Sequence, residues 1–456
     1  MKATALLACL ALAACGAPET ARQEPLAIAL PPMKTFTRAA PNPPRGSNAR
    51  IARDFLDLTF FLENGDALPV FSRFEGPVTI AIDGAAPASL GPDLDRLVAR
   101  LRHEAGIDIT RVSAAPAMIT VVPVTRGQIR RAAPTAACFV RPNVSSWGDY
   151  TRRKNDPSTA WTSLTERRRM AVFLPTDVSP QEMRDCLHEE IAQALGPVND
   201  LYRLPESIFN DDNFNTVLTG FDMLILRATY DRALHSGMTE GQVAARIPGI
   251  LNRLNPAGAS QGIAPPIDTP RDWRNAVEAA SVPVGPRAAR LTAARRAVRI
   301  AEGFGAQDTR RAFSDYLLGR LLVRDDPADA LDDLLAAGRI YHDRPDTAIQ
   351  EAHVALQIAA FQLSSGHADE AIALVDDNLP VARQAEHATL LALLLMVKAE
   401  SLAVLGRTAE AGTVQQEALA WARYGFRDST ETRDRIAELQ AISPRTAQTA
   451  GRKGPA

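Results

Sequence analysis

The sequence has few of the residues that enzymes use most often for metal or nucleophilic chemistry. Only 7 histidines and 4 cysteines occur among 456 residues. No two histidines stand at the spacing of zinc ligands. The chain has no G-x-S-x-G elbow, no G-x-x-x-x-G-K-[ST] loop and no G-x-G-x-x-G after a predicted strand. These absences argue against an α/β-hydrolase nucleophile, a phosphate-binding loop and a dinucleotide site.

An excess of positive charge is also missing. Lys and Arg total 51 against 53 Asp and Glu, which gives a net charge of -2. Without a broad basic field the chain cannot neutralise a phosphate backbone, so we expect no nucleic-acid partner. The hydrophobic content of 46% and the charged content of 23% are ordinary for packed globular structure, so disorder is not the main theme.

The first residues, MKATALLACLALAACG, have the pattern of a secretion signal: one positive charge, a short apolar run and small residues. The end of this run, Leu12-Ala13-Ala14-Cys15, resembles the lipobox of bacterial lipoproteins. Residues 1–15 would be the signal peptide with its lipobox, and the resemblance implies cleavage before Cys15 and lipid on its thiol; an ordinary signal peptide with a chance cysteine is the alternative. Because Gly16 follows, the resemblance implies the outer membrane, facing the periplasm.

No later segment is apolar enough to span a bilayer, so the lipid on Cys15 would be the only membrane anchor. Cys9 would leave with the signal, and Cys138 and Cys186 would remain in the folded part. Two cysteines in an oxidising compartment predict one disulfide, with two buried free thiols as the alternative.

Composition divides the rest of the chain into five parts. Residues 16–47 are rich in Pro, Ala and Thr and are interpreted as a tether. Residues 48–255 are mixed in pattern, residues 256–286 form a Pro- and Gly-rich linker, and residues 287–440 have an almost wholly helical pattern. We expect residues 441–456 to be a frayed tail.

The mixed region alternates helix and strand patterns. Helical spacing occurs at residues 51–61 and 90–106, and β-branched alternation occurs at residues 73–84 and 117–124. The order helix, strand, helix, strand predicts an α/β or α+β fold.

The helical region contains a possible repeat. Gly366 and Gly406 lie 40 residues apart, and each is followed by an Ala, Ala371 and Ala411, at the same offset. A glycine would end one helix and a small alanine would let the two helices approach closely. The pattern resembles a tetratricopeptide-like solenoid, which implies binding of a protein or peptide partner; an irregular helical bundle is the alternative.

One helix can be delimited from the sequence alone. Ser179 and Glu182 form a capping-box pattern with proline at the first helical position, so the helix begins at Pro180, and Gly196-Pro197 stops it. A helical wheel predicts one buried stripe: Met183, Leu187, Ile191, Ala194 and Leu195. The same wheel places Cys186, Glu189, Glu190 and Gln193 on an adjoining polar face. His188 lies away from them, and we interpret it as a surface residue or a supporting residue rather than a ligand.

This helix and the loop after it resemble the metzincin pattern H-E-x-x-H-x-x-G-x-x-H, in which a helix supplies two zinc ligands and a general base. Alignment matches Glu189, Gln193 and Asn199 to the three ligands, Glu190 to the general base and Gly196 to the glycine. The glycine and the base are kept, whereas the histidines are replaced. The resemblance implies a zincin-like domain with altered ligands.

The resemblance continues downstream. The triplet Ser207-Ile208-Phe209 is similar to the Ser-x-Met turn of that fold, with Phe209 in place of methionine, and LTGFDMLILRATY (218–230) is similar to its later helix. The chain also resembles an uncharacterised family of proteobacterial lipoproteins, the domain of unknown function 2927, through HEEIAQALGPVNDLY, ESIFNDDNF, LTGFDMLILRATYD and LAWARYGF. In the loop between these motifs, we expect Phe209 and Phe214 to anchor the chain in the core.

These observations favour an α+β zincin-like domain followed by an all-α helical-repeat domain. Amide oxygens are weak zinc ligands, so we expect no zinc and no other cofactor; a hard divalent metal on oxygen ligands, with charge from Asp200, Asp211 and Asp212, is the alternative. The leading hypothesis is a non-catalytic lipoprotein that binds a protein or peptide, in which the edge of the sheet holds an extended peptide. A metallohydrolase that uses Glu190 as its base, and a purely structural lipoprotein, are the two alternatives.

Overall fold

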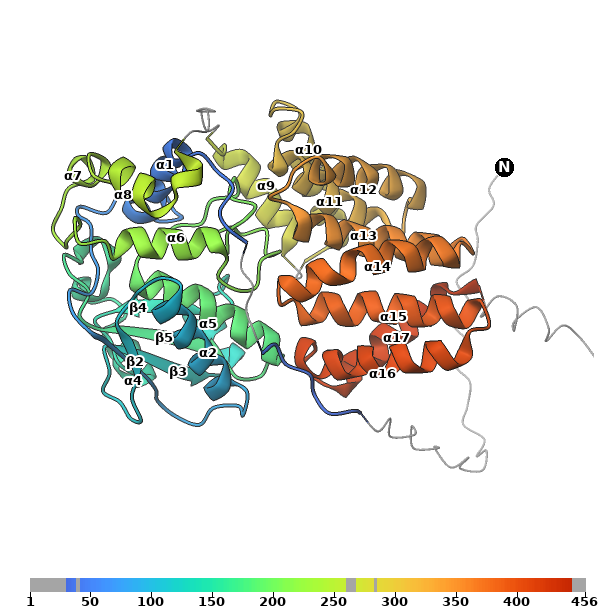
Figure 1. Cartoon of the computed structure of the whole chain (residues 1–456), viewed down its shortest axis with the longest axis horizontal. Helices are drawn as coiled ribbons and strands as arrows, with labels where there is room; N and C mark the ends of the chain where they lie inside the picture. The colour runs from blue at the N-terminus through green and yellow to red at the C-terminus, as the bar shows by residue number, and fades with distance from the viewer. Residues whose placement is uncertain (1–29, 38–41, 260–267, 283–284, 445–456) are drawn as a thin grey trace, which may run out of the picture. The chain divides into compact units, whose positions relative to one another are not determined.

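The computed structural model describes residues 30–37, 42–259, 268–282 and 285–444 (Figure 1). From Pro31 onward the chain is a single unit. Cys15, the predicted lipid site, and most of residues 441–456 lie outside the described residues. Within the described ranges, none of the helices combines the length and the apolarity that a membrane span requires.

A mixed α/β region comes first and an all-helical region follows it. The elements of the mixed region are α1 (Asn48–Phe60), β1 (Val78–Ile82), α2 (Leu90–His103), β2 (Ile109–Arg111), β3 (Ile119–Val124), α3 (Arg126–Ala132), β4 (Phe139–Pro142), α4 (Trp147–Arg153), η1 (Pro157–Thr159), η2 (Trp161–Ser163), β5 (Met170–Pro175), α5 (Pro180–Leu195), α6 (Gly220–Thr229), α7 (Glu240–Ala244), α8 (Ile247–Leu254) and η3 (Pro256–Gly258). The elements of the helical region are α9 (Arg271–Ser281), α10 (Arg287–Ala301), α11 (Thr309–Leu322), α12 (Pro327–His342), α13 (Ala348–Ser364), α14 (Ala368–Gln384), α15 (Ala388–Val404), α16 (Thr408–Gly425) and α17 (Ser429–Ile442).

The helices predicted at residues 51–61 and 90–106 and the strands predicted within 73–84 and 117–124 are confirmed as α1, α2, β1 and β3. The sequence did not reveal β2, β4 and β5. Together the five strands form one sheet in the order β2-β1-β3-β5-β4. All neighbours are parallel except β4, which pairs antiparallel with β5 and forms one edge of the sheet.

Side chains of β5 alternate between the two faces of the sheet, as the two-residue period of a strand requires. Met170, Val172 and Leu174 belong to the main core, which they share with apolar residues of α2 and α5. Ala171 and Phe173 face the other side, where a smaller cluster contains residues of α3 and α4. Helix α5 therefore lies across one buried face of the sheet, with β5 and β4 beneath it (Figure 1).

The two repeat glycines end helices in the predicted way. Gly366 follows α13 with φ +85°, and Gly406 follows α15 with φ +75°. The backbone N–H groups of Gly366 and His367 donate to the carbonyls of Leu363 and Gln362, which is the Schellman pattern of a helix end. The same pattern recurs at Gly406. Each glycine thus lets the chain turn into the next helix without a steric penalty.

Parts of the predicted tether and linker are ordered against the helices. Within residues 256–286 the structure has helix α9, whose Trp273 is fully buried and donates from its indole N–H to the Ser314 hydroxyl at 2.9 Å. Within residues 16–47, Phe36 is buried and its ring stacks on Trp421 of α16 with 4.6 Å between the centroids. Both segments contribute to the apolar core of the helical region.

Candidate functional site

The predicted bounds of the motif helix are confirmed. Helix α5 runs from Pro180 to Leu195, the Ser179 hydroxyl accepts a hydrogen bond from the Glu182 N–H at 3.0 Å, and Gly196 is the C-cap. The second half of the predicted capping box does not form. Instead, the Glu182 carboxylate pairs with Arg126, so this side chain links α5 to α3.

The predicted buried stripe of α5 is confirmed, because all five of its members are buried. The surface interpretation of His188 is wrong. His188 is buried, and its Nδ1 accepts a hydrogen bond from the Leu218 N–H at 3.2 Å. Burial and three nearby arginines, Arg100 first among them, hold the pKa of His188 well below its usual range, so the ring is neutral and serves as a backbone acceptor.

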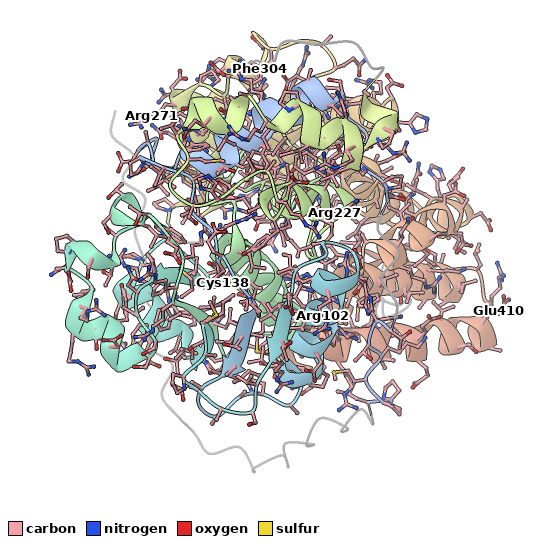
Figure 2. The ribbon with its side chains drawn as sticks, turned by 60° about the vertical axis from the view of Figure 1, so that its left-hand side comes forward. Arg102, Cys138, Arg227, Arg271, Phe304 and Glu410 are labelled. Atoms are coloured by element: carbon pink, nitrogen blue, oxygen red, sulfur yellow. A yellow bond between two sulfur atoms is a disulfide. The ribbon has the colours of Figure 1, made fainter. Side chains whose placement is uncertain are left out.

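A disulfide fastens α5 to the edge strand. Cys138, labelled in Figure 2, immediately precedes β4 and is bonded to Cys186, with 5.9 Å between the Cα atoms. The predicted pairing is confirmed. The bond closes a loop across a sequence separation of 48 residues, and on a chain-entropy argument such a loop contributes about 4 kcal/mol to stability.

The polar face of α5 carries two adjacent carboxylates in a poorly solvated position. Glu190 is only 4% exposed, and one of its oxygens has no hydrogen-bond partner among the described residues. Burial, followed by the charges of Glu189 and Glu63, raises the pKa of Glu190 well above its usual range. Burial and the charges of Asp211 and Glu63 raise the pKa of Glu189 to about 8. At neutral pH Glu189 is therefore mostly protonated, and burial favours the protonated form of Glu190.

Further carboxylates from the loops approach the same helix face. Asp200 is 6% exposed, keeps one oxygen without a partner in the described structure, and has its pKa raised well above the usual range by burial and by Glu189, Asp211 and Glu63. Asp211 is exposed at the surface, yet partial desolvation by the surrounding loop and the charge of Glu63 raise its pKa to about 7. Five carboxylates thus lie near one another: Glu63, Glu189, Glu190, Asp200 and Asp211.

The predicted metal ligands are not arranged as a ligand set. Both polar atoms of the Asn199 side chain are occupied: its amide N–H donates to the Asp57 carbonyl at 3.0 Å, and its oxygen accepts from the Asp200 N–H at 3.0 Å. Gln193 reaches the Asp200 carboxylate at 3.5 Å. Within the described ranges, no group of three or more His, Cys, Asp or Glu side chains is placed to hold a metal ion.

The two downstream motifs meet in space. Thr219 and Asp222 form a capping box at the start of α6, and the Asp222 carboxylate also accepts from the Ser207 hydroxyl at 2.5 Å and from the Ile208 N–H at 3.1 Å. The turn at Ser207 and the LTGFD segment are therefore held together by one buried side chain.

Residues 48–249 match a family model described as Protein of unknown function (DUF2927). No curated protein matches the chain. The DUF2927 region includes α5, the disulfide and the loop from Asn199 to Gly220, and so it contains every residue of the predicted ligand set.

The β4 edge of the sheet in the DUF2927 region is poorly suited to pairing; β2 forms the other edge. The Asn143 N–H donates to the Arg169 carbonyl, and because antiparallel pairs alternate, the backbone groups of Val140 and Pro142 point away from β5. Pro142 has no N–H to offer, and the Val140 N–H faces the Glu190 carboxyl and lowers its pKa. An added peptide strand would thus find few free donors on β4.

The loop that follows α5 is anchored as predicted by Phe209 and Phe214, which are both buried. The two rings enter different cores. Phe209 lies in the core of the DUF2927 region, whereas Phe214 lies in the core of the helical region, 5.8 Å from the ring of Phe313. Tyr202 also joins the helical core, edge-on to Trp273 at 5.1 Å.

The first half of α5 is bound to the helical region. Arg184, 1% exposed at its side chain, pairs with the Glu386 carboxylate at 3.1 Å and also donates to the Glu386 carbonyl. The Gln181 amide lies 3.1 Å from His387 Nδ1, and its oxygen accepts from the Thr389 N–H at 2.9 Å. Glu386 occupies the helix-end position that glycine fills elsewhere, with φ +52°.

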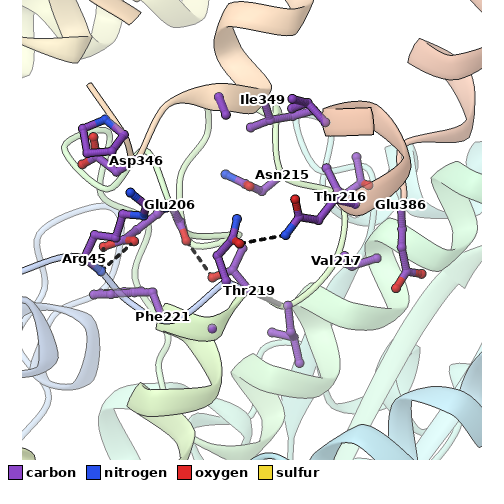
Figure 3. Close-up of a pocket in the computed structure, with 18 of the residues that line it drawn as sticks. Arg45, Glu206, Asn215, Thr216, Val217, Thr219, Phe221, Asp346, Ile349 and Glu386 are labelled. Carbon is purple, nitrogen blue, oxygen red and sulfur yellow. Dashed lines mark hydrogen bonds between the residues drawn. The ribbon is translucent and has the colours of Figure 1, made fainter. Parts of the chain in front are cut away.

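A cavity of about 130 Å³ lies between the loop from Glu206 to Phe221 and the ends of α13 and α14 (Figure 3). Two of its carboxylates already have partners. The Glu206 carboxylate accepts from the Arg45 N–H at 3.1 Å, and Asp346 pairs with Arg344 at 2.7 Å. These carboxylates are therefore satisfied, in contrast to those on α5, while the Arg45 side chain is exposed to solvent.

Sequence reasoning missed Glu63, a member of the acidic group, and also Asp185, whose carboxyl lies near Glu189. Asp185 stands one helical turn before Glu189, so the wheel that grouped Glu189 with Gln193 also contained it. Glu63 comes from the turn after α1, and no local pattern connects that turn with α5.

Proposed function

We propose that the protein is a lipid-anchored envelope protein whose DUF2927 region is a zincin-like scaffold that binds a ligand without zinc catalysis. The sheet with one antiparallel edge strand, the motif helix beside it and the Ser207–Asp222 link between the two downstream motifs support the zincin-like assignment. The helical region, with its repeated glycine-ended hairpins, supports a tetratricopeptide-like module that contacts a protein partner.

One observation carries the non-catalytic assignment. Asn199, aligned with the third zinc ligand, uses its amide N–H and its oxygen in two backbone hydrogen bonds. A metal would have to displace the Asp200 N–H from that oxygen, and amide oxygens are weak ligands for zinc. Glu190 is consistent with this assignment, because burial raises the pKa of its carboxyl well above the usual range, and a protonated carboxyl cannot accept a proton from water.

The test is elemental analysis of the purified chain carrying Cys15→Ser, with and without prior chelation. We expect no stoichiometric metal in the wild-type site, the same result in Glu189→Ala, and no hydrolysis of casein or of an unstructured peptide. One tightly bound ion per chain that is lost in Glu189→Ala, together with hydrolysis that Glu190→Gln abolishes, would establish the metallohydrolase alternative instead.

Anchoring is tested separately. If Cys15 carries lipid, radiolabelled palmitate is incorporated into the wild-type chain and fractionates with the outer membrane. Cys15→Ser should lose the label and appear in the soluble periplasmic fraction. Cys9→Ser, which alters the other cysteine of the signal, is the matched control and should keep the label. Labelling that persists in Cys15→Ser would contradict the anchor.

A further inference from the structure

A small cavity opens between α5 and the loop that follows it. It has a volume of about 80 Å³. Three carboxylates line it, those of Asp185 and Glu189 from α5 and of Asp211 from the loop. The other lining residues are Ile208, Asn210, Asn213, Asn215 and Thr216. The polar groups of these side chains are carboxyls, amides and one hydroxyl, and no cationic side chain lines the wall.

Several polar atoms in this wall have no partner within the described residues. Thr216 is only 5% exposed, and its hydroxyl makes no hydrogen bond. One buried oxygen of Asp185 is likewise unpartnered. The Glu189 side chain is half-buried and makes no hydrogen bond or ion pair with another described residue, so its carboxyl reaches solvent. Buried polar groups in native proteins are nearly always satisfied, so the buried atoms of Thr216 and Asp185 indicate a missing partner.

The surroundings add negative charge but little positive charge. Glu190 and Asp200 lie near the carboxyls that line the cavity, and each keeps one buried oxygen without a partner in the described structure. Two arginines lie close enough to act on these carboxyls, Arg184 on Asp185 and Arg274 on Asp211, but each also has another partner: Arg184 pairs with Glu386, and Arg274 donates to the Glu63 carbonyl at 3.1 Å. Burial raises the pKa of Asp185 well above its usual range, and the charge of Arg184 only partly offsets this effect.

We propose that this cavity binds a primary ammonium group, as carried by a lysine side chain of a peptide, between Asp185, Glu189 and Asp211. An ammonium has three N–H donors and no acceptor, which complements a wall of carboxyl, hydroxyl and amide oxygens, and its charge favours the ionised form of Glu189, whose proton leaves to solvent on binding. The small volume admits such a head group and excludes a bulky one. Because the acidic side chains are not arranged to coordinate an ion at metal distances, the cavity favours a hydrogen-bonding cation.

This inference rests on the proposed ligand-binding function and names the chemistry of the ligand. It also provides a recognition site that does not depend on the edge of β4, where Pro142 and Glu190 limit strand addition. Specificity would come from the side chain of the bound peptide, because leaving a buried carboxylate unpaired disfavours a neutral residue at that position.

The experiment uses the full chain with Cys15→Ser and two capped, fluorescein-labelled pentapeptides, Gly-Gly-Lys-Gly-Gly and the same peptide with norleucine at the centre. Fluorescence anisotropy at low salt measures their binding. We expect the lysine peptide to bind at least about tenfold more tightly, since a hydrogen-bonded charge pair is worth roughly that factor or more. Unlabelled n-butylammonium chloride should compete, and tetramethylammonium chloride, which has no N–H donor, should not.

Glu189→Gln and Asp185→Asn should each weaken binding of the lysine peptide by about tenfold and leave binding of the norleucine peptide unchanged. Asp434→Asn, which removes the same charge from an exposed position on α17, is the matched control and should bind like the wild type. Thr216→Val, which removes only the unpartnered hydroxyl, gives a second probe of the wall, and near-UV circular dichroism verifies that each variant is folded.

Equal binding of the two peptides, or lysine binding that survives both carboxylate variants, would overturn the ammonium site. Binding of Ca²⁺ but not of the ammonium probes would do the same. These outcomes are distinct from failure of the proposed function, which would appear as a stoichiometric metal and hydrolysis in the elemental and peptidase assays. Binding of n-butylammonium in calorimetry, with no binding of the lysine peptide, would overturn the peptide ligand.

Discussion

The two halves of helix α5 differ in whether their buried ionisable side chains have partners. In the first half, Arg184 is almost fully buried, yet it has a carboxylate, a carbonyl and two aromatic faces as partners. In the second half, Glu189 and Glu190 have few partners and are surrounded by other acids. A charge that is satisfied within the chain serves stability, whereas a group of carboxylates left without counter-ions identifies the surface where a ligand completes the structure.

The strongest way to break this comparison is to remove the satisfied charge. Arg184→Met keeps much of the side-chain volume but leaves the Glu386 carboxylate buried without its partner. Removing one member of a buried ion pair typically costs about 3–5 kcal/mol, so we expect the free energy of unfolding in urea to fall by that amount. Arg407→Met removes an arginine from an exposed pair with Glu410 and should leave stability almost unchanged. A small loss in Arg184→Met would show that water already reaches this pair.

A pH series tests the second half of α5, where the carboxyls have few partners. The pKa of Glu189 is raised from 4.5 to about 8 by burial and by its acidic neighbours, so between these values the folded protein holds a proton that the unfolded chain has released. Its contribution to stability is therefore complete below about pH 4.5 and is lost as the pH rises toward 8. Urea unfolding at pH 5, 6 and 7 should give a slope that is shallower in Glu189→Gln, by up to about 1.4 kcal/mol per pH unit.

For that series Asp434→Asn is again the control, because an exposed carboxylate should leave the slope unaltered. Identical slopes in the wild type and Glu189→Gln would mean that the carboxylates on α5 are fully hydrated in solution, and the difference between the two halves of the helix would disappear.

The smallest expected effect concerns the backbone of Glu386, the residue that pairs with Arg184. Glu386→Gly and Glu386→Ala both lose the carboxylate, but only alanine retains a side chain at φ +52°. We expect the glycine variant to be more stable by about 1 kcal/mol, as measured by urea unfolding. Gly366→Ala, at φ +85°, should lose a similar amount. Equal stability of the two Glu386 variants would show that the backbone there relaxes freely.

Local signals in the sequence were sufficient for α5 and for the helical region. The cap at Ser179, the stop at Gly196 and the apolar stripe all act within one helix, and the cysteine count left one natural pair. The strands were harder to see. MAVFLP in β5 is buried on both faces and shows no alternation, and β4 is only four residues long and ends in proline.

The acidic group could be predicted only in part, because its members come from distant segments. Glu63 and Asp200 are brought together by the packing of α1 against the loop after α5, and no spacing in the chain records that contact. His188 shows a related limit. Its neighbour on the wheel, Ala192, is fully buried, but the backbone of Leu218 that covers this side belongs to another segment.

The aromatic anchors of the loop after α5 have a consequence for how the protein can be divided. Tyr202 and Phe214 lie inside the DUF2927 match, yet their rings complete the core of α9, α11 and α13. A truncation at residue 249 would strip both rings of their packing and would release the very loop that carries Asp211. The family boundary is therefore not a folding boundary: the ligand site cannot be transplanted without the helices, and any partner that reshapes those helices acts directly on the site.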